Sequence, residues 1–323
     1  MYDVITIGAA TQDVFLQSKG FHLLHSPRLK RTCECFPLGE KINVERIDFA
    51  TGGGATNAAA TFCNLGFKTT AVAKVGYDSS GDAVREDLRA RRIPVSWVAR
   101  AKKGTTGYSA ILLTAHGDRT ALIHRGVSAQ IGAGDIPWKN LSARWIFVTS
   151  LAGNMKLLKR LFTAACARGI RIAFNPGMQE LRRGLADMRA HCGAAHVLFL
   201  NRQEASVLAG GVRDIRRLRR ALHPHFQNAV VVTDGKKGAW YWDEARFLFA
   251  RALRVNVVNS TGAGDAFGSG FISGILRWRD PVRALQLATL NAAGTIQRMG
   301  AKRGLLTRMP SRKELQHVNV TRL

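Results

Sequence analysis

The sequence predicts an α/β protein whose mostly parallel sheet is covered by helices on both faces. From residue 144 onward, short apolar strands alternate with helical segments, a pattern typical of parallel strands joined by helical crossovers. The chain has 323 residues, of which 46% are hydrophobic, enough to bury one large core. Two helix-poor stretches with alternating polarity, near 12–50 and 104–125, do not fit that layer. We expect them to form a small separate β-sheet, the lid, over the carboxyl edge of the main sheet.

The individual elements follow from local hydrophobic patterns and turn residues. The predicted strands are 3–8, 42–49, 69–75, 105–113, 119–124, 144–149, 170–175, 197–200, 229–233, 239–242 and 246–250. The predicted helices are 52–65, 80–92, 154–168, 178–191, one opened by 201–204, 214–222 and one that runs to 278. A turn at Ala115-His116-Gly117-Asp118 joins the two strands of the hairpin. Because there is no internal repeat or low-complexity linker, we interpret residues 1–323 as a single domain with an inserted lid.

The chain is strongly basic, with 48 Lys and Arg against 22 Asp and Glu and a net charge of +26. Such a charge attracts nucleic acid and other anions without specificity. The basic residues are spread along the chain, however, and neither interleaved aromatic residues nor a nucleic-acid motif accompanies them. We therefore interpret them as a solvated basic surface that also attracts an anionic substrate. We expect no specific nucleic-acid partner.

The cysteines and the N-terminus favour a cytoplasmic protein. The five cysteines are odd in number and scattered, without a C-x-x-C pair, which indicates reduced thiols. Cys33 and Cys35 have no second pair of ligands at zinc-site spacing. Residues 1–8 have the pattern of a strand rather than of a signal peptide, and no apolar run approaches the ~18 residues that span a bilayer. We expect a cytoplasmic location and no membrane partner.

Residues 257–271 carry the most informative motif, Val-Val-Asn-Ser-Thr-Gly-Ala-Gly-Asp-Ala-Phe-Gly-Ser-Gly-Phe. We expect a strand, a Gly-Ala-Gly turn and a helix, so that backbone N–H groups and the helix dipole converge on an anion. Gly262 and Gly264 allow the backbone to approach that anion closely. Asp265 follows directly, and a carboxylate beside an anion cradle suits phosphoryl transfer to a hydroxyl. The alternative is a helix N-cap followed by glycines that permit tight packing.

Further polar residues follow predicted strands, where ligands of open α/β sheets bind. Asp13 lies beyond the first strand, either toward a ligand or in an Asx-turn. Gly52-Gly53-Gly54 opens a helix that carries Asn57 in its first turn, and three glycines there favour close approach of a ligand. Asn201 and Glu204 either hold a hydrated Mg²⁺ or form a capping box.

Two more segments have the composition of a nucleotide site. Thr233-Asp234-Gly235 ends a strand and could cradle a phosphate or a ribose. Asn291 belongs to a helix of small residues, 288–294, which is able to lie flat against a planar base. Each of these patterns is weak evidence by itself, and the interpretation rests on the order in which they occur along the chain.

The motifs occur in the order Asp13, Gly52-Gly53-Gly54 with Asn57, Asn201-x-x-Glu204, Thr233-x-Gly235 and Thr261-Gly262-Ala263-Gly264-Asp265. In this combination the chain resembles the ribokinase-like carbohydrate kinases, the PfkB family, across nearly its whole length. No GxxxxGK[ST] motif is present, which argues against a P-loop kinase. The resemblance implies a three-layer α/β/α sandwich with a small β lid, and lids of this family often pair to form homodimers.

The resemblance also implies transfer of the γ-phosphoryl group of ATP, with Mg²⁺, to a hydroxymethyl group of a sugar or nucleoside. Asp265 is then the catalytic base, and the backbone of Gly262, Ala263 and Gly264 is the anion hole. The remaining roles that it implies are substrate binding by Asp13, Gly53 and Asn57, nucleotide binding by Thr233, Gly235 and Asn291, and organisation of Mg²⁺ by Asn201 and Glu204 through water.

The chain departs from the family pattern at Asn259-Ser260-Thr261, where Asp-Thr-Thr or a similar triplet is usual. The leading Asp often helps to hold a monovalent cation. Because Asn259 keeps an oxygen ligand but loses the charge, activation by K⁺ stays open. Arg125, just after the hairpin, would lie near the lid and pair with a carboxylate or phosphate of the substrate or with ATP phosphates.

The acceptor also stays open. Residues 123–129 are similar to 2-keto-3-deoxygluconate kinases and equally to sugar and nucleoside kinases of mixed specificity, so ribose, fructose, sugar acids and nucleosides are all candidates. Two other classes of function fit parts of the sequence. One is a non-catalytic sugar-binding protein on the same fold, against which the intact Asp265, Asn201 and Glu204 argue. The other is a basic nucleic-acid-binding protein, motivated by the charge of +26.

Overall fold

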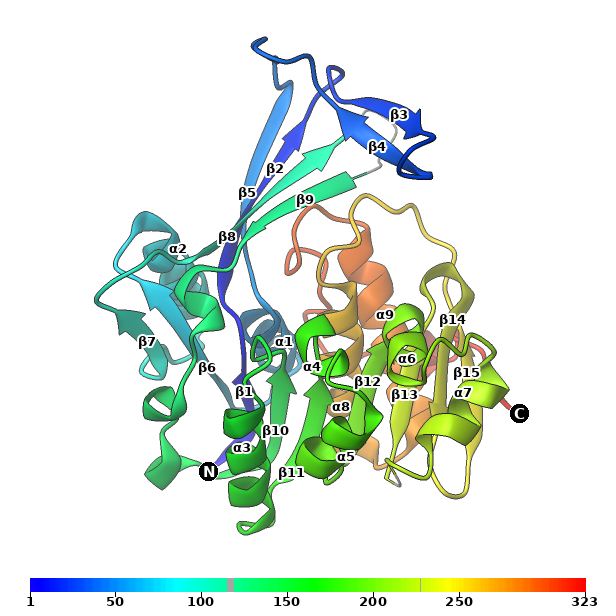
Figure 1. The fold of residues 1–323 in the computed structure, drawn as a ribbon. Coiled ribbons are helices and arrows are strands. Elements are labelled where there is room, and N and C mark those ends of the chain that lie inside the picture. Colours follow the sequence, from blue (N-terminus) through cyan, green and yellow to red (C-terminus); the bar gives the residue numbers. More distant parts are fainter. Residues whose placement is uncertain (115–118, 227) are drawn as a thin grey trace.

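The computed structural model describes residues 1–114, 119–226 and 228–323 and is built around a ten-stranded sheet (Figure 1). The strand order is β16-β15-β14-β13-β12-β11-β10-β1-β6-β7. In chain order their bounds are β1 Tyr2–Ile7, β6 Thr69–Gly76, β7 Val98–Ala101, β10 Ala143–Thr149, β11 Arg171–Asn175, β12 Val197–Asn201, β13 Val230–Thr233, β14 Gly238–Trp242, β15 Phe247–Arg251 and β16 Val320–Arg322. The strands from β7 to β13 are parallel, and β14, β15 and β16 add an antiparallel edge. The predicted mostly parallel sheet is confirmed.

Helices cover both faces of this sheet and make three layers (Figure 1). Their bounds are α1 Gly54–Asn64, α2 Ser79–Ala90, α3 Met155–Cys166, α4 Met178–Leu181, α5 Leu185–Cys192, α6 Arg202–Leu208, α7 Ile215–Leu222, α8 Ala263–Trp278, α9 Pro281–Ile296 and α10 Arg312–Leu315. Helices α3, α5, α6 and α7 share one apolar core with the sheet. Helices α1, α8 and α9 share a second core, on which Phe267 and Phe271 pack against Phe199 of β12 and its neighbours.

A second, four-stranded sheet has the order β5-β2-β8-β9. Its bounds are β2 Thr11–Gln17, β5 Arg46–Gly52, β8 Gly107–Leu113 and β9 Arg119–His124, and β3 His22–Ser26 and β4 Arg31–Cys35 form a separate hairpin. These strands come from the two ranges that the sequence assigned to the lid. The second sheet projects beyond the carboxyl ends of the central strands, with the β3–β4 hairpin at its tip (Figure 1). Since β1 leads through Gly8, Ala9 and Ala10 directly into β2, Asp13 lies at the junction of the two sheets.

The structure differs from the prediction in a few places. The apolar stretch before the Gly-Ala-Gly turn was predicted to be a strand, but residues 252–257 have no regular secondary structure. The short edge strands β7 and β16 and the lid strands β2, β3 and β4 were not predicted individually, and the predicted helix 178–191 is divided into α4 and α5. The predicted turn at Ala115-His116-Gly117-Asp118 lies outside the described residues. Among the helices that are described, none is both long and apolar enough to cross a membrane.

Candidate active site

The N-terminus of α8 has the geometry of an anion cradle. Gly262 precedes the helix in the left-handed conformation, with φ of 76°, and a Cβ added to it would lie 2.4 Å from Ala301 Cβ. Gly264, in contrast, faces open space, because an added Cβ would meet nothing within 4 Å. The first N–H groups of a helix have no partner within the helix and favour a negative charge in front of them. The turn therefore presents backbone N–H groups toward an open region, of which the Ala263 N–H also donates to the Ser260 carbonyl oxygen at 3.4 Å.

Asp265, in the first turn of α8, is held by a residue distant in sequence. Asn57 Nδ2 donates a hydrogen bond of 2.9 Å to Asp265 Oδ2. This bond turns the amide so that Oδ1 points away from the carboxylate. Within the described part of the chain, the buried Oδ1 of Asn57 has no hydrogen-bond partner. A buried acceptor without a partner is costly, and a hydroxyl group bound beside Asp265 would satisfy it.

Asp13 lies nearby and is also buried, with 4% of its surface exposed. The hydroxyls of Ser109 and Thr11 donate hydrogen bonds to its carboxylate. Gly52 packs so closely against it that an added Cβ would lie 2.3 Å from Asp13 Oδ2. Gly53 has φ of 93°, and its added Cβ would lie 2.4 Å from the Ala9 carbonyl oxygen. A Cβ added to Gly54 would lie 2.7 Å from the Thr149 side chain, so all three predicted glycines are required by close packing against the protein itself.

Both carboxyl groups have raised pKa values. For Asp13 and Asp265, burial is the main cause of the increase. The hydrogen bond from Asn57 and the positive charge of Lys302 lower the pKa of Asp265, whereas the negative charge of Asp13 raises it. Two buried carboxyl groups with raised pKa values in a concave region are typical of functional sites.

A cavity of about 530 Å³ adjoins the cradle and brings several predicted residues together. Thr233 and Gly235, at the end of β13, line it with Ala263 and Gly264 of α8. The wall is mostly apolar and is formed by residues of 252–257 and of α9. Its size lies in the range of cofactor sites, about 300–1,000 Å³. The cradle thus opens on one side to a mostly apolar cavity and on the other to the buried carboxylates.

Asn291 does not line this cavity. It is fully buried in α9, and its Nδ2 donates to the Ala266 carbonyl oxygen at 2.8 Å, while its Oδ1 accepts from the Leu306 N–H at 2.9 Å. Its amide therefore fastens α9 to α8 and to the following loop. The neighbouring Ala292 and Ala293 form part of the cavity wall instead.

Asn201 and Glu204 form a reciprocal capping box at the start of α6. Glu204 N–H donates to Asn201 Oδ1 at 2.9 Å, and Asn201 N–H donates to Glu204 Oε2 at 2.8 Å. Burial raises the pKa of Glu204, and the negative charge of Asp265 raises it further. Glu204 Oε1 takes no part in the box, so the carboxylate keeps a ligand oxygen for a hydrated Mg²⁺, which needs few protein ligands. The residues present fit such an ion.

The other two predicted positions are placed as follows. Asn259 is buried, and its Oδ1 accepts a hydrogen bond of 3.0 Å from the Thr261 N–H. The amide oxygen on which a K⁺ site would depend therefore also shapes the turn before the cradle. Arg125 follows β9 at the base of the lid, and its side chain is exposed.

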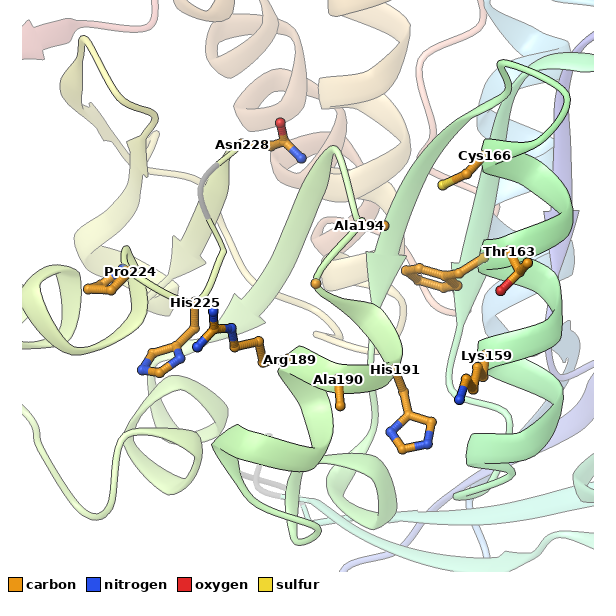
Figure 2. Close-up of a pocket in the computed structure, with 12 residues that line it drawn as sticks. Lys159, Thr163, Cys166, Arg189, Ala190, His191, Ala194, Pro224, His225 and Asn228 are labelled. Carbon is orange, nitrogen blue, oxygen red and sulfur yellow. The ribbon is translucent and has the colours of Figure 1, made fainter.

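A larger cavity, of about 620 Å³, contains none of the predicted site residues (Figure 2). Its basic side chains are Lys159, Arg189, His191 and His225, and Figure 2 shows Arg189 beside His225. It is lined by α3, α5 and the segment before β13, so it lies near the amino ends of the parallel strands. Ligands of open α/β sheets bind at the carboxyl ends, where the cradle is located.

Two contributors to the site could not be predicted from the sequence. One is the irregular segment 252–257, whose Val255 and Val257 line the cavity; Val257 was predicted to belong to a strand because it is β-branched, and Val255 was not singled out. The other is Lys302, whose charge acts on both buried carboxylates. In a chain of such basic composition, a lysine in a loop carries no distinguishing signal.

Comparison with known proteins agrees with this geometry. Residues 6–308 match the pfkB family carbohydrate kinase. The chain is 30% identical over 249 residues to an uncharacterized sugar kinase of Archaeoglobus fulgidus, covering 75% of this chain and 96% of the relative. It is 28% identical to a cytidine kinase of Thermococcus kodakarensis, over 82% of this chain and 92% of the relative. It is 25% identical to a ribokinase of Staphylococcus aureus, over 82% and 88%.

Solved structures share the fold at lower sequence identity. The ribokinase of Arabidopsis thaliana in complex with ribose and ATP has a TM-score of 0.76 at 19% identity and covers 98% of both chains. The ribokinase of Cryptococcus neoformans in complex with ADP has a TM-score of 0.74 at 19% identity, over 98% of this chain and 99% of that one. At this level of identity the similarity shows a common ribokinase fold.

Proposed function

Because the chain belongs to the pfkB family of carbohydrate kinases, which are phosphotransferases that act on hydroxyl groups, we propose that it transfers the γ-phosphoryl group of ATP to a small sugar. The acceptor is a hydroxymethyl group of the ribose, fructose or sugar-acid type. The observation that carries the proposal is the pair of Asn57 and Asp265, in which a carboxylate and an unsatisfied buried amide oxygen adjoin an anion cradle. A nucleoside acceptor is the alternative, since a cytidine kinase is among the relatives.

The proposed reaction uses each side of the site. Asp265 accepts the proton of the acceptor hydroxyl as its oxygen forms a bond to the γ-phosphorus. The bond from that phosphorus to the bridging oxygen breaks, and ADP leaves. The N–H groups of Ala263 and Gly264 stabilise the charge that develops on the transferred group. Asp13 and Asn57 accept hydrogen bonds from hydroxyls of the sugar and orient it.

The nucleotide is proposed to occupy the 530 Å³ cavity, with its phosphates toward Gly264 and its base against the apolar wall. This proposal is supported by the apolar lining and by the ADP and ATP complexes of structurally similar ribokinases. Asn201 and Glu204 would organise Mg²⁺, which when bound neutralises phosphate charge. Whether K⁺ activates the enzyme depends on the Asn259 turn, so turnover is to be measured with and without K⁺.

The test is an ATP-consumption screen over sugars, sugar acids and nucleosides. We expect ADP formation with at least one acceptor, and a loss of at least about 10³-fold in kcat in Asp265→Asn. The matched control is Asp280→Asn, which also removes one negative charge. Asp280 caps α9 through a bond from the Val282 N–H, Asn caps equally well, and the residue is about 24 Å from the cradle along α8. Full activity of Asp265→Asn would contradict the role as base.

The two other classes of function give different results in the same assays. A non-catalytic sugar-binding protein would bind a sugar but form no ADP with any acceptor. A nucleic-acid-binding protein would keep its affinity for one sequence at ~150 mM salt, whereas general electrostatic attraction declines steeply with salt. Arg189→Ala separates the cavity of Figure 2 from the nucleotide site, since we expect it to leave the KM for ATP unchanged.

We also propose that two copies of the chain pair through their lids. The second sheet exposes apolar side chains on two of its strands, Ile47 and Phe49 of β5 and Leu122 and Ile123 of β9. Exposed apolar side chains gathered on one element are typical of interaction surfaces. Light scattering across a concentration series tests this arrangement, and a monomer at every concentration would contradict it.

A further inference from the structure

Lys302 is a buried cation that the proposed reaction does not use directly. Only 4% of its side chain is exposed, although lysine is almost never buried without a partner. Its Nζ lies 3.1 Å from Asp87 Oδ2 of α2. It also donates to the Thr51 side-chain oxygen at 2.7 Å and to the Thr51 carbonyl oxygen at 3.1 Å. The ammonium group therefore joins the segment after α9, helix α2 and strand β5 of the lid.

The contact with Thr51 is made at the base of the lid. Thr51 is followed by Gly52 and Gly53, which lead from β5 into α1. Gly52 packs directly on the Asp13 carboxylate, and β5 pairs with β2 so that Ala50 is opposite Asp13. By holding the Thr51 carbonyl, Lys302 fixes the piece of backbone that touches Asp13.

Lys302 also supplies positive charge to the site. The charged groups that face it are Asp87 of α2, Arg91 directly after α2 and Asp13 of β2, and its field reaches Asp265 of α8. Burial raises the pKa of Asp13 and of Asp265, and the charge of Lys302 lowers both. Burial lowers the pKa of Lys302 itself, whereas Asp87 raises it. The pKa of Lys302 is lowered overall, because burial outweighs the opposing effect of Asp87. In its charged form, the lysine opposes protonation of the two carboxyl groups.

We propose that Lys302 is a positioning residue for phosphoryl transfer: its ammonium group holds β5 against Asp13 and supplies positive charge to Asp13 and Asp265. This inference rests on the proposed function, because ionised carboxylates are needed there to accept a proton and to bind sugar hydroxyls. A purely structural ion pair between α2 and the segment after α9 is the competing explanation. The two explanations differ in what happens when both members of the pair are removed.

The test compares Lys302→Met with the double variant Lys302→Met/Asp87→Asn. The single variant removes the buried cation that pairs with Asp87 and leaves that carboxylate paired with Arg91, at 2.9 Å. It is therefore expected to unfold at lower urea concentration. The double variant is expected to recover much of that stability, because the buried ammonium and its carboxylate are removed together, and Arg91, the other partner of Asp87, is partly exposed to water. Its acidic limb of kcat/KM is nevertheless expected to stay displaced by about one pH unit to higher pH, since a cation within ~10 Å is missing. Recovery of both stability and the pH profile would overturn the proposal.

Two further variants serve as controls. Lys302→Arg keeps the charge and is expected to keep the acidic limb near its original pH. Lys74→Met removes another partly buried ammonium, which pairs with Asp135 at 3.0 Å and acts on neither carboxylate of the site. We expect it to leave the acidic limb in place, and a displacement as large as that of Lys302→Met would overturn the proposal.

A readout without turnover separates this inference from the proposed function. Carboxyl ¹³C NMR titration follows Asp13 and Asp265 directly in the free protein. We expect both to titrate at higher pH in the double variant than in the unmutated chain. If no acceptor is phosphorylated by the unmutated chain, the proposed function fails while this titration still decides the role of Lys302. Unchanged titration of both groups would overturn it.

Discussion

Gly262 and Gly264 of the cradle differ in backbone conformation and in the space around them. Replacing Gly262 by alanine should therefore lower stability, whereas replacing Gly264 should impair the use of ATP. In Gly262→Ala, alanine must adopt the left-handed conformation at φ of 76°, which costs about 1–2 kcal/mol. Its methyl group would also lie 2.4 Å from Ala301 Cβ, and overpacking of this kind costs about 1–3 kcal/mol. The free energy of unfolding should therefore fall by about 2–5 kcal/mol. Urea denaturation should show a lower midpoint with an unchanged m-value.

Gly264→Ala provides the matched comparison within the same turn. The added methyl group meets nothing within 4 Å, and alanine is favoured over glycine in a helix by up to about 1 kcal/mol. The folded state should be at least as stable as that of the unmutated chain. The methyl group projects into the proposed phosphate position, so kcat/KM for ATP should fall by at least about tenfold, or ~1.4 kcal/mol. Unchanged kinetics of Gly264→Ala, or an undiminished stability of Gly262→Ala, would refute this account of the cradle.

Two further predictions concern polar contacts around the site. In Asn57→Ala the pKa of Asp265 should rise, because the donated hydrogen bond that lowers it is removed. We expect kcat to fall by about 10–100-fold and the acidic limb of kcat/KM to move to higher pH. An acidic limb that stays at its original pH would contradict this role of Asn57. Asp78→Ala removes the hydrogen bonds that the Gly81 N–H and the N–H and hydroxyl of Thr106 donate to this carboxylate. The free energy of unfolding at pH 7 should therefore fall by about 1–3 kcal/mol. Burial raises the pKa of Asp78, but the hydrogen bonds from Thr106 and Gly81 outweigh burial, so the folded-state pKa is lowered. The stability that Asp78 contributes is therefore present above the unfolded pKa of ~3.9 and is lost as the pH falls through the folded-state pKa. Urea midpoints of the two proteins that differ equally at pH 7 and pH 3 would contradict this account.

Local sequence patterns were sufficient for the framework of the site. The alternation of strands and helices fixed the parallel sheet, and the parallel sheet brings residues such as Asn201 and Thr233 to the same edge, where they are register partners. The Gly-Ala-Gly turn followed by small residues indicated where α8 begins. These features depend on periodicity and on turn chemistry, both of which are properties of short segments.

Local patterns could not predict which side chains of a helix or loop point into the cavity and which point into the core. Asn291 lies in the predicted helix, but its side chain turns inward and binds Ala266, so that its neighbours line the cavity instead. Val257 was predicted to be a strand residue because β-branched side chains favour sheets. In the structure it lines the cavity, with 58% of its surface exposed, and it pairs with no described strand.

The sequence alone also could not show that two carboxylates are held where the folded chain makes them hard to ionise. Asp13 and Asp265 are 252 positions apart in the sequence. Burial nevertheless raises the pKa of both, and the negative charge of Asp13 raises the pKa of Asp265 further. A sequence selected only for stability would replace such groups, because a buried charge costs free energy unless it is paired. Here Asn57, Ser109 and the distant charge of Lys302 compensate for that cost only in part. This uncompensated cost of burial supports the proposal that phosphoryl transfer takes place at this edge of the sheet.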